Sequence, residues 1–475
     1  MKKLLTLLLS FVFCTQPVLA QRSAASARSA ASSRTAASGG VPALVKYGFG
    51  ANATGGEGHS TVFVTNLNDS GAGSFREAVS SGNRIVKFQV GGYIDLQSAL
   101  LIDADNITID GTDAPNFGIC FRGHTLGTVN SNNQIWRGIH SRSNTHAETI
   151  DSFRVQNSFN LLFDHCSFTH GNDGCLDITG GSHDITVQFC LIFESLGSGN
   201  MLFGNDSYNL SVIKCVLGNG SRCGGELLFG EVDYVNNIVF RDYVKENADR
   251  YYENVLTLPP DVPSDGSQGA SNGTRALLIN VRGNRFIAGS EEDADDGKKA
   301  VYTYGDRFRS SIAVMCFKQN YCVSTRESDA LSETAFVSME APITFTGTEH
   351  NHQRGFTPAN PFDAGFEDSI LDNVGCIYPG RDALDAAIIA GIRARSRTTG
   401  RFGAFNDISE AGGYPSLSGT PSGSGNPRQA ASSRAPIAMI IVMVDPWSLK
   451  VMLFGMVALA LLAALSMMLR RRRRQ

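Results

Sequence analysis

The sequence predicts an all-β protein folded as a right-handed parallel β-helix, and three observations point to this fold class. First, short segments of alternating polar and apolar residues recur in the middle of the chain, beginning at Asn106, Asn133, Asn160, Asp184 and Asn209. Second, cysteines recur in the same phase, at steps of 24 and 25 residues: Cys166, Cys190 and Cys215. Third, glycine makes up 50 of 475 residues and charged residues only 18%, a composition typical of many turns and few solvated helices.

A single strand phase repeated at this period indicates stacked coils, because each repeat can bury its apolar face only against its neighbours. Equivalent residues then form ladders about 4.8 Å apart. The three cysteines are expected in one such ladder, as buried thiols rather than metal ligands or disulfides. A propeller needs several strands per repeat, and a structural zinc site needs Cys-x-x-Cys spacings, which the sequence lacks.

The two ends of the chain carry targeting signals. Lys2 and Lys3 precede a short apolar run and the small residue Ala20, the pattern of a cleaved secretory signal peptide. Residues 451–469 carry no charge and are followed by five arginines at 470–474, which predicts a transmembrane helix with a cytosolic tail. A lipid-anchor signal would end on apolar residues instead.

These signals divide the chain into six predicted segments. They are a signal peptide (1–20), an Ala/Ser/Arg-rich linker (21–40), the β-helix domain (41–417), a Ser/Gly/Pro-rich stalk (418–435), a membrane-proximal segment with the transmembrane helix (436–469), and a polybasic cytosolic tail (470–475). The domain is therefore expected in the secretory pathway, outside the cytosol and anchored by a single pass. Seven Asn-x-Ser/Thr sequons further predict a glycoprotein: Asn52, Asn68, Asn106, Asn205, Asn209, Asn219 and Asn272.

The overall charge excludes one class of partner. The chain has 41 Lys+Arg and 45 Asp+Glu, so its formal net charge of −4 provides no basic field for nucleic acid. The flat flank of a β-helix suits an extended polymer such as a polysaccharide. It suits an adhesin or a purely structural surface protein equally well, so the fold alone does not give the function.

Four residues are candidates for chemistry, because a period of about 24 residues brings them to one flank: Asp151, Asp173, Asp177 and Arg222. Three clustered carboxylates repel one another unless they are protonated or bridged by a cation, and hard oxygen ligands suit Ca²⁺. An alternative for Asp173 is that its Asp-Gly dipeptide only forms a turn. Asp177 is harder to explain in that way, since it interrupts an apolar strand.

The motifs around these residues resemble the pectate lyase family. They are Phe-Asp-His-Cys at 163–166, Asp-Gly-Cys-Leu-Asp-Ile at 173–178, Gly-Phe-Gly-Ala-Asn-Ala-Thr-Gly-Gly at 48–56, the segment 64–78, Arg-Asp-Ala-Leu-Asp at 381–385 and Gly-Gly-Tyr-Pro at 412–415. The resemblance covers residues 41–417. It implies a pectin-lyase-like right-handed β-helix that cleaves polygalacturonate by Ca²⁺-dependent β-elimination, with an acidic polysaccharide as its partner, and we expect a monomer.

Carried over motif by motif, the resemblance makes Asp151, Asp173 and Asp177 the calcium carboxylates and Arg222 the catalytic base. The sequence departs from the family pattern at three places. Gly199-Asn200 precedes Met-Leu-Phe-Gly where the family often has a lysine, Gly224 takes the place of a proline, and Glu226 and Leu227 lie near where a second arginine is expected. These departures leave the residues that bind substrate unassigned.

Two hypotheses for the function follow. The first is a calcium-dependent polyuronate lyase tethered at the cell surface. The second is a β-helical adhesin or carbohydrate-binding protein that retains the metal site without turnover, in which Arg222 is only a solvated loop arginine. A methyl-ester-specific lyase fits less well, because it would not need the three carboxylates.

Overall fold

The structure is a computed structural model of the whole chain. It describes residues 41–143, 150–197, 199–220, 223–241, 257–258, 276–288, 301–303, 313–323, 337–339, 344–346, 348–350, 356–395 and 413–418. The predicted signal peptide, linker, transmembrane helix and tail lie outside the described residues, and so does Arg222. Within the described part of the chain, no helix is both long enough and apolar enough to cross a membrane.

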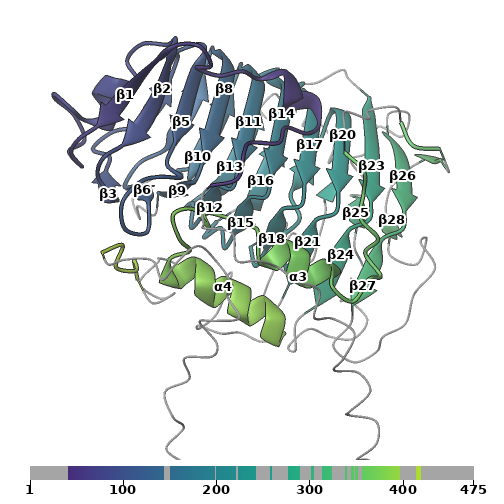
Figure 1. Cartoon of the computed structure of the whole chain (residues 1–475). Coiled ribbons are helices and arrows are strands. Elements are labelled where there is room, and N and C mark those ends of the chain that lie inside the picture. Colours follow the sequence, from purple (N-terminus) through teal and green to yellow (C-terminus); the bar gives the residue numbers. More distant parts are fainter. Residues whose placement is uncertain are drawn as a thin grey trace, which may run out of the picture. The chain divides into compact units, whose positions relative to one another are not determined.

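Three parallel sheets, which we call A, B and C, wind around a common core (Figure 1). Sheet A consists of β1 (Ser60–Val64), β2 (Arg84–Phe88), β5 (Ile107–Asp110), β8 (Asn132–Arg137), β11 (Phe159–Asp164), β14 (His183–Gln188), β17 (Tyr208–Ile213), β20 (Gly230–Val235), β23 (Leu277–Arg282), β26 (Ala313–Lys318) and β29 (Thr344–Phe345).

Sheets B and C have nine strands each. Sheet B consists of β3 (Gly92–Asp95), β6 (Ile119–Arg122), β9 (Ile139–Arg142), β12 (Ser167–Thr169), β15 (Leu191–Phe193), β18 (Val216–Gly218), β21 (Ile238–Arg241), β24 (Arg285–Ala288) and β27 (Tyr321–Val323). Sheet C consists of β4 (Leu100–Ile102), β7 (Leu126–Val129), β10 (Phe153–Gln156), β13 (Gly174–Thr179), β16 (Gly199–Phe203), β19 (Glu226–Leu227), β22 (Thr257–Leu258), β25 (Val301–Thr303) and β28 (Val337–Met339).

The parallel β-solenoid predicted from the repeat is confirmed. Leu161, Ile185 and Leu210 pair in register across β11, β14 and β17, and all three side chains are fully buried. From β2 to β28, consecutive strands belong to sheets A, B and C in turn, so each of these coils contributes one strand to each sheet. The hand of the coil remains a prediction from the general right-handedness of parallel crossovers.

The predicted cysteine ladder is also confirmed, and it serves as a run of hydrogen-bond acceptors. The backbone N–H of Cys166 donates to Cys190 Sγ (3.4 Å), and that of Cys190 donates to Cys215 Sγ (3.4 Å). The next rungs of the same ladder are asparagines, since the N–H of Cys215 donates to Asn237 Oδ1 at 2.9 Å and that of Asn237 to Asn284 Oδ1 at 2.8 Å. The three cysteines are free thiols.

Replacing Cys190 by alanine is expected to lower the free energy of unfolding by about 1–3 kcal/mol, because the buried N–H of Cys166 loses its acceptor. Cys120→Ala is the matched control, since Cys120 is equally buried but its Sγ makes only a long contact, 3.7 Å, to the Phe121 carbonyl. Urea unfolding monitored by fluorescence measures both. Equal losses in the two variants would show that the thiol ladder contributes only its packing.

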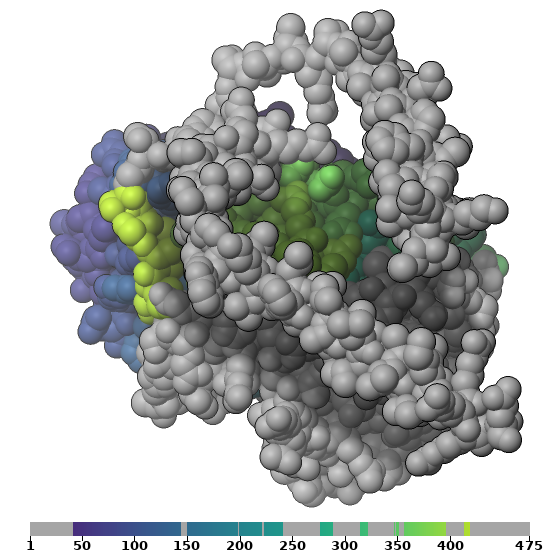
Figure 2. Space-filling model, turned by 90° about the horizontal axis from the view of Figure 1, so that it is seen from below, coloured from purple at the N-terminus to yellow at the C-terminus, as the bar shows by residue number. Residues whose placement is uncertain are grey.

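Other segments cover the outer faces of sheets A and B. Helices α3 (Phe366–Leu371) and α4 (Ala383–Ala394) pack their apolar side chains on sheet B (Figure 1), and the green surface in Figure 2 belongs to this C-terminal part of the chain. The short helix α2 (Phe75–Ala78) follows β1 and buries Phe75 in the core.

The N-terminal segment crosses the face of sheet A, at the 3-10 helix η1 (Phe49–Asn52). The N–H groups of Phe49 and Gly50 donate to Ser211 Oγ (3.1 Å) and Thr186 Oγ1 (2.9 Å) on β17 and β14. A Cβ atom on Gly50 would lie 2.1 Å from the carbonyl oxygen of Leu161, so only glycine allows this approach. The described segments therefore leave the outer face of sheet C as the one sheet face without a covering helix or strap.

Candidate functional site

The site lies on the outer face of sheet C, where strand alternation separates core from surface. Phe153 and Val155 of β10 point inward and are fully buried, so Arg154 between them points outward. On the next strand Asp177 pairs in register with Arg154. The aspartate that interrupts an apolar strand thus belongs to the outer face, as the sequence suggested.

Asp151 and Asp177 meet beside Gly174. The N–H of Gly174 donates to Asp151 Oδ1 at 3.1 Å. A Cβ atom on Gly174 would lie 2.3 Å from Asp177 Oδ1 and 3.2 Å from Asp151 Oδ1, so the two carboxylate oxygens face one point that only glycine leaves open. Two carboxylate oxygens held side by side in this cradle suit a hard cation, because Ca²⁺ binds carboxylate oxygens.

Asp173 lies directly before this glycine and is partly buried. Its charge contributes to raising the pKa of both Asp151 and Asp177, which places it in the same acidic cluster. The carboxylate oxygens of Asp151, Asp173 and Asp177 do not all lie within 4.8 Å of one another. Among the described residues, a group that compact is formed by His140, Asp382 and Asp385.

The electrostatics of the cluster favour a cation. Burial raises the pKa of Asp177 well above its usual value, and the neighbouring charges of Asp151 and Asp173 raise it further. Burial also raises the pKa of Asp151, although Arg154 opposes this shift through Nε and Nη2, at 2.7 and 2.6 Å from Asp151 Oδ2. One guanidinium thus faces several carboxylates, and a divalent ion would relieve their repulsion.

Glu226 is a fourth carboxylate of the cluster, and the sequence did not indicate this role. It is buried on β19, where Leu202 stands between it and Asp177 in one column of sheet C. It too raises the pKa of Asp177. Positions 177, 202 and 226 are 25 and 24 residues apart, which is the coil period. This spacing could have predicted that Glu226 lies in the same column as Asp177.

Arg222 lies outside the described residues, but the loop on either side of it is anchored. Asn200 is fully buried and donates through Nδ2 to the carbonyl oxygens of Gly218 (2.9 Å) and Cys223 (3.0 Å). Tyr234 Oη donates to the Gly224 carbonyl at 3.1 Å. Asn200, found where the family often has a lysine, thus positions the loop and does not face a substrate.

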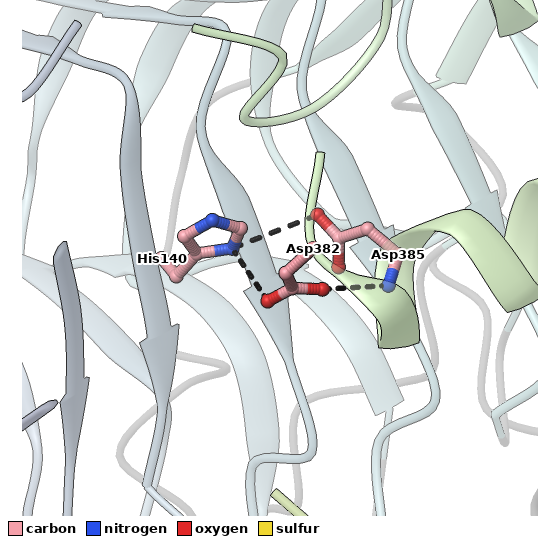
Figure 3. A group of neighbouring side chains, drawn as sticks. All are labelled: His140, Asp382 and Asp385. Atoms are coloured by element: carbon pink, nitrogen blue, oxygen red, sulfur yellow. Dashed lines mark hydrogen bonds and ion pairs between the residues drawn. The ribbon is translucent and has the colours of Figure 1, made fainter. Parts of the chain in front are cut away.

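A second acidic group, His140, Asp382 and Asp385, brings its ligand atoms within 4.8 Å of one another (Figure 3). It is already occupied by a side chain, because Arg142 Nη1 lies 2.6 Å from Asp382 Oδ2 and Nη2 lies 2.7 Å from Asp385 Oδ1. All four side chains are fully buried. The guanidinium fills the place of a cation, so this group is an ion-pair cluster between sheet B and α4.

The cluster explains the closing motif at 381–385. Asp382 is the N-cap of α4, where its Oδ1 accepts from the Asp385 N–H at 2.9 Å, and Ser167 Oγ donates to Asp385 Oδ2 at 2.6 Å. Burial by itself would raise the pKa of Asp382, but the charges of Arg142 and His140, together with the hydrogen bonds from Arg142 and the Asp385 N–H, outweigh it and hold this pKa well below its usual value. The motif therefore fastens the C-terminal helix to the solenoid and lies apart from the acidic cluster on sheet C.

Known proteins resemble parts of this chain in sequence, and one solved structure resembles it in fold. The "Probable pectate lyase C" of Aspergillus fumigatus is 30% identical over 302 residues, which are 59% of this chain and 69% of that protein. The protein of the same name from Emericella nidulans is 40% identical over 150 residues, 31% of this chain and 35% of that protein. No protein-family model matches the chain.

Among solved structures, that of the thermostable pectate lyase PL 47 matches with a TM-score of 0.52 over 70% of this chain and 97% of that one, at 13% identity. This likeness supports the fold alone. The matches span between about a third and two thirds of the length of the first curated relatives, 35%, 69% and 60%.

A parallel β-solenoid with a carboxylate cluster on sheet C, whose outer face no described helix or strap covers, places the chain among the β-helical proteins. Within that class the chain belongs to the pectate lyase family, a family of polysaccharide lyases. The resemblance that the motifs predicted is thereby confirmed.

Proposed function

We propose that the protein is a calcium-dependent polysaccharide lyase that cleaves polygalacturonate, or a related polyuronate, by β-elimination. The observation that carries this proposal is the cradle at Gly174, where oxygens of Asp151 and Asp177 lie within 3.2 Å of the position that a Gly174 Cβ would take, on a face of sheet C that no described segment covers. Relatives named pectate lyases support the choice of substrate class. Asp151, Asp173 and Asp177 would hold the Ca²⁺.

In this proposal the chemistry is divided between the cation and Arg222. When bound, Ca²⁺ would supply positive charge to the uronate carboxylate and so acidify the proton on C5. Arg222 takes that proton, the C5–H electrons form the C4–C5 double bond, and the C4–O bond breaks with its oxygen taking a proton from water. An arginine holds its own proton to above pH ~12 in water, so we expect an alkaline optimum.

The binding alternative draws on two described residues. Where the family has cationic groups, Asn200 is buried within the loop and Glu226 adds negative charge. A protein that has lost the groups that clamp substrate could still bind metal and polymer without turnover. Detection of an unsaturated product separates the two hypotheses, because an adhesin forms none.

The cellular setting completes the proposal. The signal peptide, stalk and C-terminal apolar helix predicted from the sequence would tether the solenoid at the outer cell surface, where an acidic polysaccharide is accessible. This part rests on the sequence pattern alone.

Replacing Asp177 by asparagine is expected to weaken Ca²⁺ binding, because a charged oxygen ligand is lost, and excess Ca²⁺ should restore part of the activity. The same change should stabilise the metal-free protein at neutral pH. Because the pKa of Asp177 is raised in the folded state, its destabilising effect is absent below the unfolded pKa of ~3.9, grows as pH rises from there to the folded pKa, and is complete above it. Calorimetry with Ca²⁺ and thermal unfolding in a chelator measure the two effects.

Asp113→Asn is the matched control, since Asp113 is an exposed carboxylate paired with Lys87. It should change neither calcium affinity nor the pH dependence of metal-free stability. Unchanged calcium affinity in Asp177→Asn would remove this residue from the site.

A further inference from the structure

Arg154 lies in the acidic cluster, where Nε and Nη2 of its guanidinium contact Asp151 and Nη1 contacts no described residue. It lies in the middle of β10 on the outer face of sheet C, and its side chain is 39% exposed. Its register neighbours are Asp177 on β13 and Gly127 on β7. A Cβ atom on Gly127 would lie 2.2 Å from the Arg154 carbonyl oxygen and 3.0 Å from Leu101 Cδ2, so glycine allows the close approach of the two strands and Leu101 borders this position.

The guanidinium uses only part of its donor set on the protein. Nε and Nη2 both point at Asp151 Oδ2, at 2.7 and 2.6 Å, while the other oxygen of Asp151 accepts from the Gly174 N–H. Nη1 makes no hydrogen bond to any described residue. One side of the guanidinium therefore fixes the orientation of Asp151, and the two N–H donors of Nη1 are not used by any residue that the structure describes.

The two Nη1 N–H donors could bind a substrate carboxylate, which the proposed function requires. A polyuronate brings one carboxylate per sugar to the cation, and those groups must be held beside a site that is itself strongly acidic. Asn200 and Glu226 cannot supply the positive charge, as described above. Arg154 is the guanidinium in register with Asp177, and its planar fork matches a carboxylate in geometry and charge.

We propose that Arg154 is a substrate-binding residue, which receives the carboxylate of a uronate beside the calcium site while its other side keeps Asp151 directed at the cradle. The inference rests on the proposed function and deepens it, because it identifies the group that would distinguish a free uronate from its methyl ester. A methyl ester lacks the charge that Arg154 recognises and would bind more weakly at this position.

The test compares Arg154→Gln and Arg154→Lys with Arg76→Gln. Arg76 is the matched control, since its Nη2 lies 2.7 Å from Asp69 and its side chain is 26% exposed. At saturating Ca²⁺, Arg154→Gln should raise KM for polygalacturonate about 10- to 100-fold, the loss expected for a charge-assisted hydrogen bond, with kcat changed far less. Arg154→Lys should fall between, because it keeps the charge and loses the fork. The preference for unesterified over methyl-esterified polymer should shrink in the same order.

Calcium calorimetry gives a readout that is independent of turnover. Arg154→Gln removes a positive charge beside the cation and also a contact that orients Asp151, two opposing effects that should leave calcium affinity nearly unchanged. If calcium affinity falls and excess Ca²⁺ restores normal KM, Arg154 only orients Asp151 and the proposal is overturned. An unchanged KM and ester preference would overturn it equally.

The proposal can fail separately from the proposed function. If the wild type binds Ca²⁺ but forms no product, the affinity for trigalacturonate in the presence of Ca²⁺ replaces KM as the readout. A loss of that affinity in Arg154→Gln, absent in Arg76→Gln, would support Arg154 while the lyase activity is rejected. Equal affinities in wild type and Arg154→Gln would reject Arg154.

Discussion

Replacing Arg142 by methionine should lower the free energy of unfolding by about 3–5 kcal/mol, because it leaves two buried carboxylates without a counter-ion. Arg142 holds Asp382 and Asp385 at 2.6 and 2.7 Å, and none of the three is exposed. These contacts join β9 to the start of α4, so their loss should release the C-terminal helix from sheet B. Thermal and urea unfolding of the purified protein measure the effect.

An exposed ion pair on the same helix provides the control. Arg393 lies 2.5 Å from Asp372, but its side chain is 31% exposed, so Arg393→Met should cost at most about 1 kcal/mol. Adding Asp382→Asn and Asp385→Asn to Arg142→Met should recover much of the loss, since asparagine still caps a helix and no buried charge remains. A loss in Arg142→Met as small as in Arg393→Met would contradict the role of the cluster.

The cluster also sets a pH dependence. The pKa of Asp382 is depressed in the folded state, so its contribution to stability is complete above the unfolded value of ~3.9 and is lost as pH falls toward the folded value. The stability difference between wild type and Arg142→Met should therefore narrow as the solution is acidified below pH ~4.

Replacing Arg222 by alanine is expected to lower turnover about 10²- to 10⁴-fold at saturating substrate, the usual cost of losing a general base. Calcium and polymer binding should remain nearly intact, because the proposed metal ligands are elsewhere. Arg222→Lys should recover little, since a flexible point charge does not reproduce a planar guanidinium. Initial rates of product formation from polygalacturonate measure the effect.

The alternative that Arg222 is a solvated loop arginine predicts almost no change in rate. Arg76→Ala is the reference for such a surface arginine. Near-normal turnover of Arg222→Ala would move the catalytic role to another residue. Inactivity of the wild type under all conditions would favour the binding protein.

The solenoid could be predicted from the sequence because its determinants are local and repeated. The strand phase at 160, 184 and 209 and the cysteine phase at 166, 190 and 215 are visible as simple periods, and the structure reproduces both in register. The outward position of Asp177 could be read from its place in an apolar strand. The proximity of Asp177 to Asp151 could be predicted from the coil length alone.

The remaining features depend on contacts that no local pattern records. Arg142 reaches Asp382 and Asp385 across 240 and 243 residues of sequence, so the closing motif could be recognised but its role could not be assigned. Arg154 looks in sequence like any solvated strand arginine, since only the ladder shows that it faces Asp177. Asn200 could be noted as a missing lysine, but its burial and its bond to Cys223 depend on how two loops meet.

In the proposed function, the acidic cluster on sheet C holds the calcium that the lyase reaction requires. The most direct measurement is the ultraviolet absorbance of unsaturated product released from polygalacturonate by the wild type, followed as Ca²⁺ is added to chelator-treated protein. We expect no product in chelator and a saturable rise of the rate with Ca²⁺. In Asp177→Asn this rise should require a higher Ca²⁺ concentration. Product formation that is indifferent to chelator, or no product at any Ca²⁺ concentration up to alkaline pH, would contradict the proposed function.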